Sequence, residues 1–291
     1  MQYQLQLQPP AALVMGQPGA GKTDALATLL EAGLKTFVIS TEPDGVSSLL
    51  DSCARRKIPI DNLHWASCLP ATPGWSALND MVNTIGTMGF EDIQKIKSGV
   101  GKTDTRQPAM KLLNTLSNFK CERTGVAFGD VTKFDDTMAL VLDSLSGLGL
   151  IAWMLTLGYK PAAHQGEWGV AMNFVEQLLL KITSDRRAFF VMNCHIEKEL
   201  NEISGVQQIM VSTLGRKLAP KIPRFFSEVV YAKRLMKDGK AIFTWSTMDT
   251  TADLKNRSLP VASDLAQDFK PIVEAYRKRK TLAAAVPATA A

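Results

Sequence analysis

The sequence predicts an α/β fold in which a mostly parallel sheet is covered by helices on both faces. Short, mostly apolar runs alternate along the chain with longer helical stretches. Continuous apolar runs are typical of strands buried on both faces, and helices between them favour parallel pairing. The 291 residues are 46% hydrophobic and 21% charged, a composition that excludes a disordered protein and provides enough chain for a large core.

Each strand is expected where an apolar run is bounded by turn residues. The runs lie at residues 11–15, 36–40, 63–67, 138–142 and 188–192. A helix over residues 22–32, ended by Gly33, follows the first run. Two later runs, at residues 229–234 and 241–246, flank a Lys-Asp-Gly turn and predict a C-terminal β-hairpin.

The stretch over residues 138–157 has the length of a membrane span, but Asp143 and several serines interrupt it. We interpret it as a buried strand, a turn and a helix. The N-terminal residues MQYQLQLQPP lack the basic and apolar regions of a signal peptide, and the cysteines and histidines show no metal-binding spacing. These features predict a cytoplasmic protein with reduced thiols and no membrane contact.

The expected domain organisation is one domain over residues 1–280, followed by a disordered, alanine-rich tail over residues 281–291. Residues 70–136 break the alternation of strands and helices. We interpret this segment as an insertion that is partly loop, with a helix-like stretch at residues 75–88.

A phosphate-binding pattern lies between the first strand and the helix that follows it. The pattern GxxxxGK[ST] is formed by Gly16, Gln17, Pro18, Gly19, Ala20, Gly21, Lys22 and Thr23. Glycines let successive backbone N–H groups surround phosphate oxygens, and the helix N-terminus adds partial positive charge. In this pattern Lys22 bridges the β- and γ-phosphates and the Thr23 hydroxyl binds Mg²⁺. ATP and Mg²⁺ are therefore the expected cofactors, with GTP left open.

A second Gly-Lys-Thr sequence, at residues 101–103, does not complete the same pattern. Ile96 stands where the first glycine is required, and no apolar strand precedes it. We interpret it as an exposed loop.

Polar residues end three of the predicted strands and should meet at one edge of the sheet, where ligands of open α/β sheets bind. Asp143 ends an apolar strand and is expected to hold Mg²⁺. Glu42 follows the second strand and is the candidate catalytic base, with Asp44 as its rival. Asn193 and His195 either sense the γ-phosphate or cap their strand.

Together these segments resemble the RecA-like P-loop ATPases over residues 11–260. The phosphate loop, the acid two residues after the second strand, LVLDSLSGL and FVMNCH carry the resemblance. Within that superfamily the chain is most similar to phage-encoded proteins with a single RecA-like domain, some of which are recombinases or single-strand annealing proteins. STEPDG, QGEWGVAMNFVEQLL, GRKLAPKIPRFFSEVVYA and ADLKNRSLP support this likeness.

The resemblance implies roles for particular residues. Glu42 matches the family's catalytic glutamate and Asp143 its magnesium-binding acid. Lys255 and Arg257 match a Lys-x-Arg pair that enters the neighbouring subunit's site and stabilises charge on the transferred phosphate. The alternative for this pair is an exposed basic turn. A homo-oligomer with ATP at the subunit interface follows from the resemblance.

The resemblance also implies contact with single-stranded DNA through the segment at residues 197–213. That segment is not basic, but it offers Gln207 and Gln208, with Ile209 and Met210 to pack between bases. The neighbouring residues 215–240 contain eight cations against two acids, a larger excess than the chain's net charge of +5. The cations nearest the segment are Arg216, Lys217 and Lys221. Stacking of bases on Trp65, Trp75 or Trp245 is the alternative to core packing of these side chains.

The resulting hypothesis is an Mg²⁺-dependent RecA-like ATPase that acts on single-stranded DNA in phage recombination or annealing, with other phage replication or recombination proteins as further partners. The alternative is a nucleotide-dependent oligomeric switch, or an accessory motor ATPase without direct DNA binding.

Overall fold

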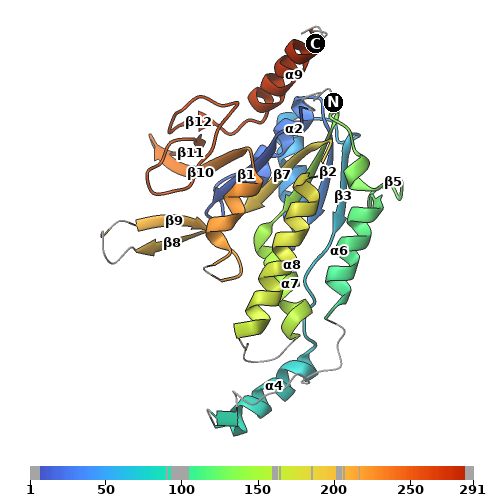
Figure 1. Cartoon of the computed structure of the whole chain (residues 1–291), viewed down its shortest axis with the longest axis vertical. Helices are drawn as coiled ribbons and strands as arrows, with labels where there is room; N and C mark the ends of the chain where they lie inside the picture. The colour runs from blue at the N-terminus through green and yellow to red at the C-terminus, as the bar shows by residue number, and fades with distance from the viewer. Residues whose placement is uncertain are drawn as a thin grey trace, which may run out of the picture.

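An eight-stranded sheet runs through the centre of the molecule (Figure 1). The computed structural model describes residues 7–89, 91–92, 105–158, 163, 165–184, 186–200, 205, 207–215 and 217–285. The strand order across the sheet is β12-β11-β10-β1-β7-β6-β2-β3. These strands are β1 (Ala11–Gly16), β2 (Lys35–Ser40), β3 (Leu63–Ser67), β6 (Met138–Asp143), β7 (Phe189–Cys194), β10 (Glu228–Lys237), β11 (Lys240–Ser246) and β12 (Leu265–Ala266).

The pairing confirms the predicted α/β class with its mostly parallel sheet. The six strands from β10 to β3 pair in parallel, and β11 and β12 are added antiparallel at one edge. β10 and β11 form the predicted hairpin. Its turn residues Asp238 and Gly239 have φ values of 52° and 74°, the sign that a two-residue turn between twisted strands requires.

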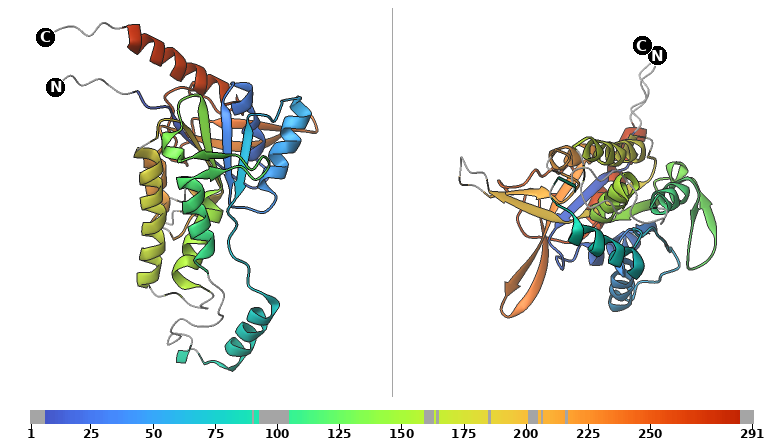
Figure 2. Two further views of the ribbon diagram at one scale, coloured as in Figure 1. Left: turned by 90° about the vertical axis from the view of Figure 1, so that its right-hand side faces the viewer. Right: turned by 90° about the horizontal axis from the view of Figure 1, so that it is seen from below.

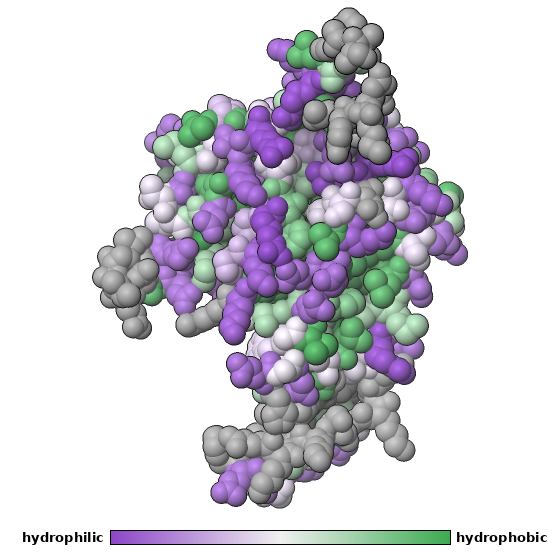
Figure 3. Space-filling view, viewed as in Figure 1, coloured by the Kyte–Doolittle hydropathy of each residue, from purple (hydrophilic) through white to green (hydrophobic). Residues whose placement is uncertain are grey.

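Helices cover both faces of the sheet (Figure 2). One face carries α1 (Lys22–Ala25), α2 (Ala27–Glu31), α3 (Gly45–Arg56) and α9 (Lys270–Ala285). The other carries α6 (Gln107–Ser117), α7 (Leu145–Leu157), α8 (Gln165–Ser184) and the 3-10 helix η2 (Ala219–Phe225). On the face viewed in Figure 1, hydrophilic and apolar residues are interspersed (Figure 3).

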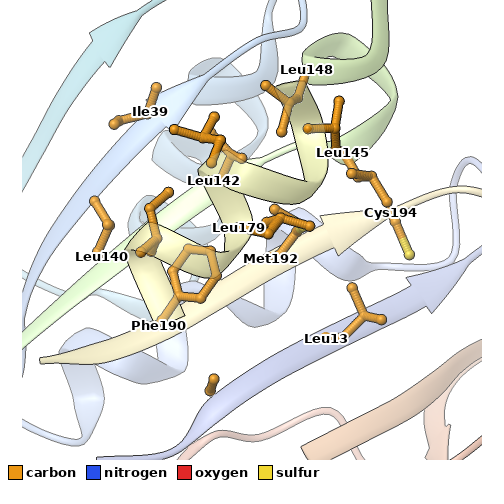
Figure 4. Packing of buried hydrophobic residues seen from close by; sticks show 14 of the residues in the cluster. Leu13, Ile39, Leu140, Leu142, Leu145, Leu148, Leu179, Phe190, Met192 and Cys194 are labelled. Atoms are coloured by element: carbon orange, nitrogen blue, oxygen red, sulfur yellow. The ribbon is translucent and has the colours of Figure 1, made fainter. Parts of the chain in front are cut away.

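The two faces of the sheet explain why its strands are apolar throughout. Leu140 and Leu142 of β6 face the cluster under α7 and α8, which Figure 4 shows from close by. Ala139 and Val141 of the same strand face the cluster under α1, α2 and α9. Since successive side chains of a strand point to opposite faces, a strand buried on both sides needs apolar residues at consecutive positions.

The long apolar stretch at residues 138–157 forms the predicted strand, turn and helix. β6 ends at Asp143, and α7 begins after Ser144. Within the described residues, none of the helices has the length and apolar character needed to cross a membrane.

The segment at residues 70–136 contributes partly to the core. α6 and the short strand β4 (Phe119–Lys120), paired with β5 (Ala127–Gly129), place Leu112, Leu116 and Phe119 in the cluster under α7 and α8. The 3-10 helix η1 (Val131–Lys133) adds Val131. By contrast, α4 (Trp75–Thr87) has no buried residue and lies away from the sheet (Figures 1 and 2). The second Gly-Lys-Thr sequence lies outside the described residues.

The prediction of a disordered tail from residue 281 is wrong for its first five residues, because α9 continues through Ala285. Leucine and alanine are strong helix formers, and they extend a helix whose first part is docked on the sheet. Residues 286–291 lie outside the described chain.

Candidate nucleotide-binding site

The phosphate loop joins β1 to α1 and is shaped by its glycines. A Cβ on Gly16 would lie 2.6 Å from the backbone oxygen of Ala232 in β10, so only glycine fits there. Gly19 and Gly21 have φ values of 71° and 83°, which disfavour any side chain. The backbone therefore turns sharply after β1 and presents the N-terminus of α1 to the cavity described below.

Lys22 is held over this loop by its own backbone. Its Nζ donates to the carbonyl oxygens of Gly16 at 2.8 Å and Gln17 at 2.9 Å, and lies 3.4 Å from Nδ1 of His195. The residue is 7% exposed, and burial lowers the pKa of the ammonium group. A buried cation that is held only by neutral oxygens and an imidazole is well suited to exchange these partners for phosphate oxygens.

Thr23 and Asp143 meet beside the loop. The Thr23 hydroxyl donates to Oδ2 of Asp143 at 2.8 Å. Burial raises the pKa of the Asp143 carboxyl, which is 5% exposed. Asn193 is the neighbour of Asp143 in the pairing of β6 with β7, and it is fully buried with neither side-chain polar atom in a geometrically good hydrogen bond.

These residues fit a magnesium ion bound mainly through phosphate and water. One carboxylate and one hydroxyl lie together, and the described residues contain no group of three or more acidic, histidine or cysteine side chains that could hold a metal alone. Mg²⁺ in phosphate-transferring sites commonly uses one or two protein ligands and completes its shell with phosphates and water. The buried Asn193 amide, next to Asp143 in the sheet, adds polar capacity to the same spot.

Glu42 lies at the other side of the cavity in a chain of polar contacts. Its Oε1 accepts from the Ser144 hydroxyl and lies 3.3 Å from Nε2 of His195. The hydrogen bond from His195 is the main cause that lowers the pKa of Glu42. The bond from Ser144 lowers the pKa further, whereas burial acts to raise it. Both contacts use Oε1, so they leave Oε2 for a water molecule.

The loop and these side chains line one cavity of about 440 Å³. Nine of the predicted site residues line it: Pro18, Gly19, Ala20, Gly21, Lys22, Thr23, Glu42, Asp143 and His195. Gly16 and Gln17 do not line it but accept hydrogen bonds from Lys22, and Asn193 neighbours Asp143 in the sheet. Asp44, the rival of Glu42, is exposed and outside this lining.

Sequence reasoning missed several residues that line the same cavity: Asp24, Ser48, Asp51, Arg55 and Phe243. Asp24 forms ion pairs with Arg55 and Arg56, which fix α3 against α1. The helical spacing of Ser48, Asp51 and Arg55, which places them on one side of α3, could have indicated that these residues face the cavity. No local pattern marked Phe243, since it reaches the loop from a distant strand.

Lys255 and Arg257 lie near the start of β10, away from the loop. The backbone of Lys255 pairs with Val229, and its Nζ donates to the carbonyl oxygens of Pro223 at 3.0 Å and Phe226 at 3.3 Å. Arg257 is exposed, and its backbone N–H donates to the buried Glu228 carboxylate at 3.0 Å. The structure does not bring this pair to the cavity of its own chain.

The proposed DNA-contacting residues fall into different environments. The segment at residues 197–213 is largely a two-stranded sheet of β8 (Ile196–Leu200) and β9 (Gln207–Val211), in which Gln207 and Gln208 are exposed. Lys217 is exposed, and Arg216 lies outside the described residues. Lys221 forms an ion pair with Glu176 at 3.1 Å, and Glu176 also pairs with Arg224.

Two hydrophobic residues that were candidates for base contact are buried instead. Ile209 is 9% exposed and packs in the core, which rules it out as a residue inserted between bases. Trp245 is fully buried against Phe269, so it cannot stack on a base. Trp65 is half-buried beside Arg123, whereas Trp75 of α4 is 84% exposed.

A scan against protein-family models and a search of curated proteins found no match to the chain. Among solved structures, one match is the flagellar accessory protein FlaH from Methanocaldococcus jannaschii, with 9% identity, a TM-score of 0.37 and coverage of 82% of this chain and 78% of that one. Another is a KaiC-like protein from Pyrococcus horikoshii, with 11% identity, a TM-score of 0.32 and coverage of 81% and 77%. At these values the assignment of the site rests on its own geometry.

Proposed function

We propose that the chain is an Mg²⁺-dependent RecA-like ATPase that acts on single-stranded DNA in phage recombination or annealing. The observation that carries the proposal is the convergence of Lys22, Thr23, Asp143, Glu42 and His195 on one cavity beside a complete phosphate loop. Four different strands supply these residues or the loop, and the sheet brings their carboxyl ends together.

In this proposal each side chain has a distinct task toward ATP. Lys22 exchanges its bonds to Gly16 and Gln17 for bonds to the β- and γ-phosphates. Thr23 and Asp143 hold Mg²⁺, which neutralises charge on the phosphates when it is bound. Oε2 of Glu42 orients the attacking water, while Ser144 and His195 fix the carboxylate through Oε1.

The oligomeric part of the proposal concerns Arg257 and Lys255. Arg257 is exposed and held in place by Glu228, whereas the ammonium group of Lys255 is engaged by two carbonyl oxygens of its own chain. A neighbouring copy that docks on this surface would receive a cation at its ATP, which makes hydrolysis dependent on assembly. Other phage replication or recombination proteins are further proposed partners.

A second candidate, a nucleotide-dependent switch with slow turnover, is favoured by one feature of Glu42. The two hydrogen bonds that hold this carboxylate also lower its pKa, and a weaker base removes a proton from water less effectively. The ion pair of Lys221 with Glu176 favours the same candidate, because it engages one cation of the predicted DNA surface within the chain.

The test is the rate of ATP hydrolysis by the purified chain with and without single-stranded DNA, over a series of salt concentrations. We expect DNA to stimulate hydrolysis and salt to weaken the stimulation, since contacts with phosphates release bound counterions. Glu42→Gln should retain ATP binding and lose most turnover, whereas the exposed Asp44→Asn serves as the matched control and should keep it. ATP binding without stimulation at any salt concentration would support the switch instead.

A further inference from the structure

The β10–β11 hairpin stands directly beside the phosphate loop. β10 pairs with β1 as far as the contact of Ala232 with Gly16, where β1 ends and the loop begins. Beyond that point β10 pairs only with β11, so the outer half of the hairpin extends past the edge of the parallel sheet. The hairpin therefore forms a wall next to the loop.

Two residues of this wall face the loop together. Arg234 and Phe243 are directly opposite each other in the pairing of β10 with β11, so their side chains share a face of the hairpin. A Cβ on Gly19 would lie 3.6 Å from Nη1 of Arg234, and a Cβ on Gly21 would lie 3.1 Å from Cδ1 of Phe243. The arginine and the ring thus lie against successive glycines of the phosphate loop.

The position of this wall is fixed by Gln267, which follows β12. Its Nε2 donates to the carbonyl oxygen of Ala20 in the loop at 2.8 Å and to that of Thr244 in β11 at 3.0 Å. The side chain of Gln267 therefore ties the hairpin to the loop at the point where Phe243 contacts it.

Both Arg234 and Phe243 remain exposed. Phe243 is 43% exposed although it lines a cavity whose other lining residues are mostly polar. Arg234 is exposed and forms no ion pair with any residue that the structure describes. Beside a phosphate loop, an exposed aromatic ring suits the base of a nucleotide, and a guanidinium without an ion pair in the described chain suits its phosphates.

The strand order sets the direction in which a nucleotide would lie. Glu42, Asp143 and His195 follow β2, β6 and β7, which all lie on one side of β1. The hairpin lies on the other side of β1. If the γ-phosphate points toward Glu42 and Asp143, the nucleoside end points toward the hairpin.

We propose that Arg234 and Phe243 form the nucleoside wall of this site, with Phe243 stacked on the base and Arg234 bonded to a phosphate oxygen. The inference rests on the proposed function, because it assumes that the loop binds a nucleoside triphosphate. Aromatic rings bind bases through their faces without reading base identity, so Phe243 distinguishes a nucleotide from a bare polyphosphate. The guanidinium contributes a charge-assisted hydrogen bond to either ligand.

The test compares the affinities of the full chain for ATP and for inorganic tripolyphosphate, both with Mg²⁺, by titration calorimetry. Phe243→Leu keeps an apolar side chain against Gly21 but removes the ring, and it should weaken ATP binding on the order of 10-fold while leaving tripolyphosphate binding unchanged. Phe243→Tyr should restore ATP binding. Ile242→Ala is the matched control, since Ile242 is 38% exposed on the opposite face of the hairpin.

Arg234→Gln should weaken the binding of ATP and tripolyphosphate alike, while Arg187→Gln, at an exposed arginine before β7, should change neither. Unchanged ATP affinity in Phe243→Leu would overturn the stacking role, and equal losses for both ligands would show that the ring acts only by shaping the loop. A wild-type chain that binds neither ligand would instead overturn the proposed function itself. The two failures are therefore distinguishable.

Discussion

Lys22 and its neighbours show which site residues a sequence can reveal at the scale of single residues. The loop pattern fixes its members through covalent spacing, so the contacts of Lys22 with Gly16 and Gln17 follow from local geometry. Arg234 and Phe243 reach the same loop only through the register of a distant hairpin. Their positions depend on the order of strands in the sheet, which no local pattern encodes.

His64 provides a prediction about stability and pH. Its ring is buried between Phe37 and Phe128, at centroid distances of 5.1 and 4.3 Å, and burial lowers its pKa from 6.5 to about 4. Between those two values the unfolded chain binds a proton that the folded chain excludes. The stability that the neutral ring provides is therefore complete above pH 6.5 and is lost as the pH falls toward 4. From pH 7 to pH 5 the loss should be about 2 kcal/mol.

The measurement is the free energy of unfolding from urea titrations at pH 7 and pH 5, for the wild type and His64→Phe. The variant keeps an aromatic ring in the cluster and has no group that titrates there. The wild type should lose about 2 kcal/mol more than the variant over this interval. Equal losses would show that His64 does not control acid stability.

At the scale of elements, Gly147 connects the fold to the site. It lies in the first turn of α7, and a Cβ there would come within 2.3 Å of Oγ1 and 2.4 Å of the backbone oxygen of Thr41. Thr41 in turn exchanges hydrogen bonds of 2.8 Å with the backbone of Ser144. The close approach of α7 to the end of β2 thus places Ser144 beside Glu42.

Gly147→Ala should therefore destabilise the protein by about 1–3 kcal/mol, because the backbone of Thr41 has to move. It should also lower the rate of ATP hydrolysis by displacing Ser144 from Glu42. The matched control is Gly169→Ala in α8, where an added Cβ meets no atom within 4 Å. That variant should be neutral or slightly stabilising, since alanine favours a helix. Equal melting temperatures for the two variants would contradict the assigned contact.

Strands β1, β2, β6 and β7 were predictable as elements because they are buried on both faces and so carry nearly unbroken apolar runs. The pairing of β8 with β9 was less predictable, since Glu197, Lys198 and Glu199 read as a polar loop. Those side chains project from a hairpin that lies outside the central sheet (Figure 1). Because β8 is largely exposed, it lacks the apolar pattern that identifies the strands of the central sheet.

At the scale of the whole molecule, folding redistributes the charge that the sequence concentrates in residues 215–240. Lys221 and Arg224 pair with Glu176 of α8, and Lys233 pairs with Asp249. Lys237 and Lys240 at the tip of the β10–β11 hairpin form no ion pair within the described chain. A count of charges along the sequence could not predict this, because the neutralising acids lie in other elements. The remaining excess gathers on the hairpin beside the nucleotide cavity.

Binding of phosphates over the loop at Lys22 is the step on which every proposed role of this site depends. The decisive measurement is the affinity for Mg²⁺–ATP, by titration calorimetry, of the wild type, Lys22→Ala and the exposed-site control Lys133→Ala. Removing a cation that bonds two phosphates should weaken binding by about 100-fold or more. Lys133→Ala should bind like the wild type, and circular dichroism should show all three proteins folded. Unchanged ATP affinity in a folded Lys22→Ala variant would contradict the assignment of the site.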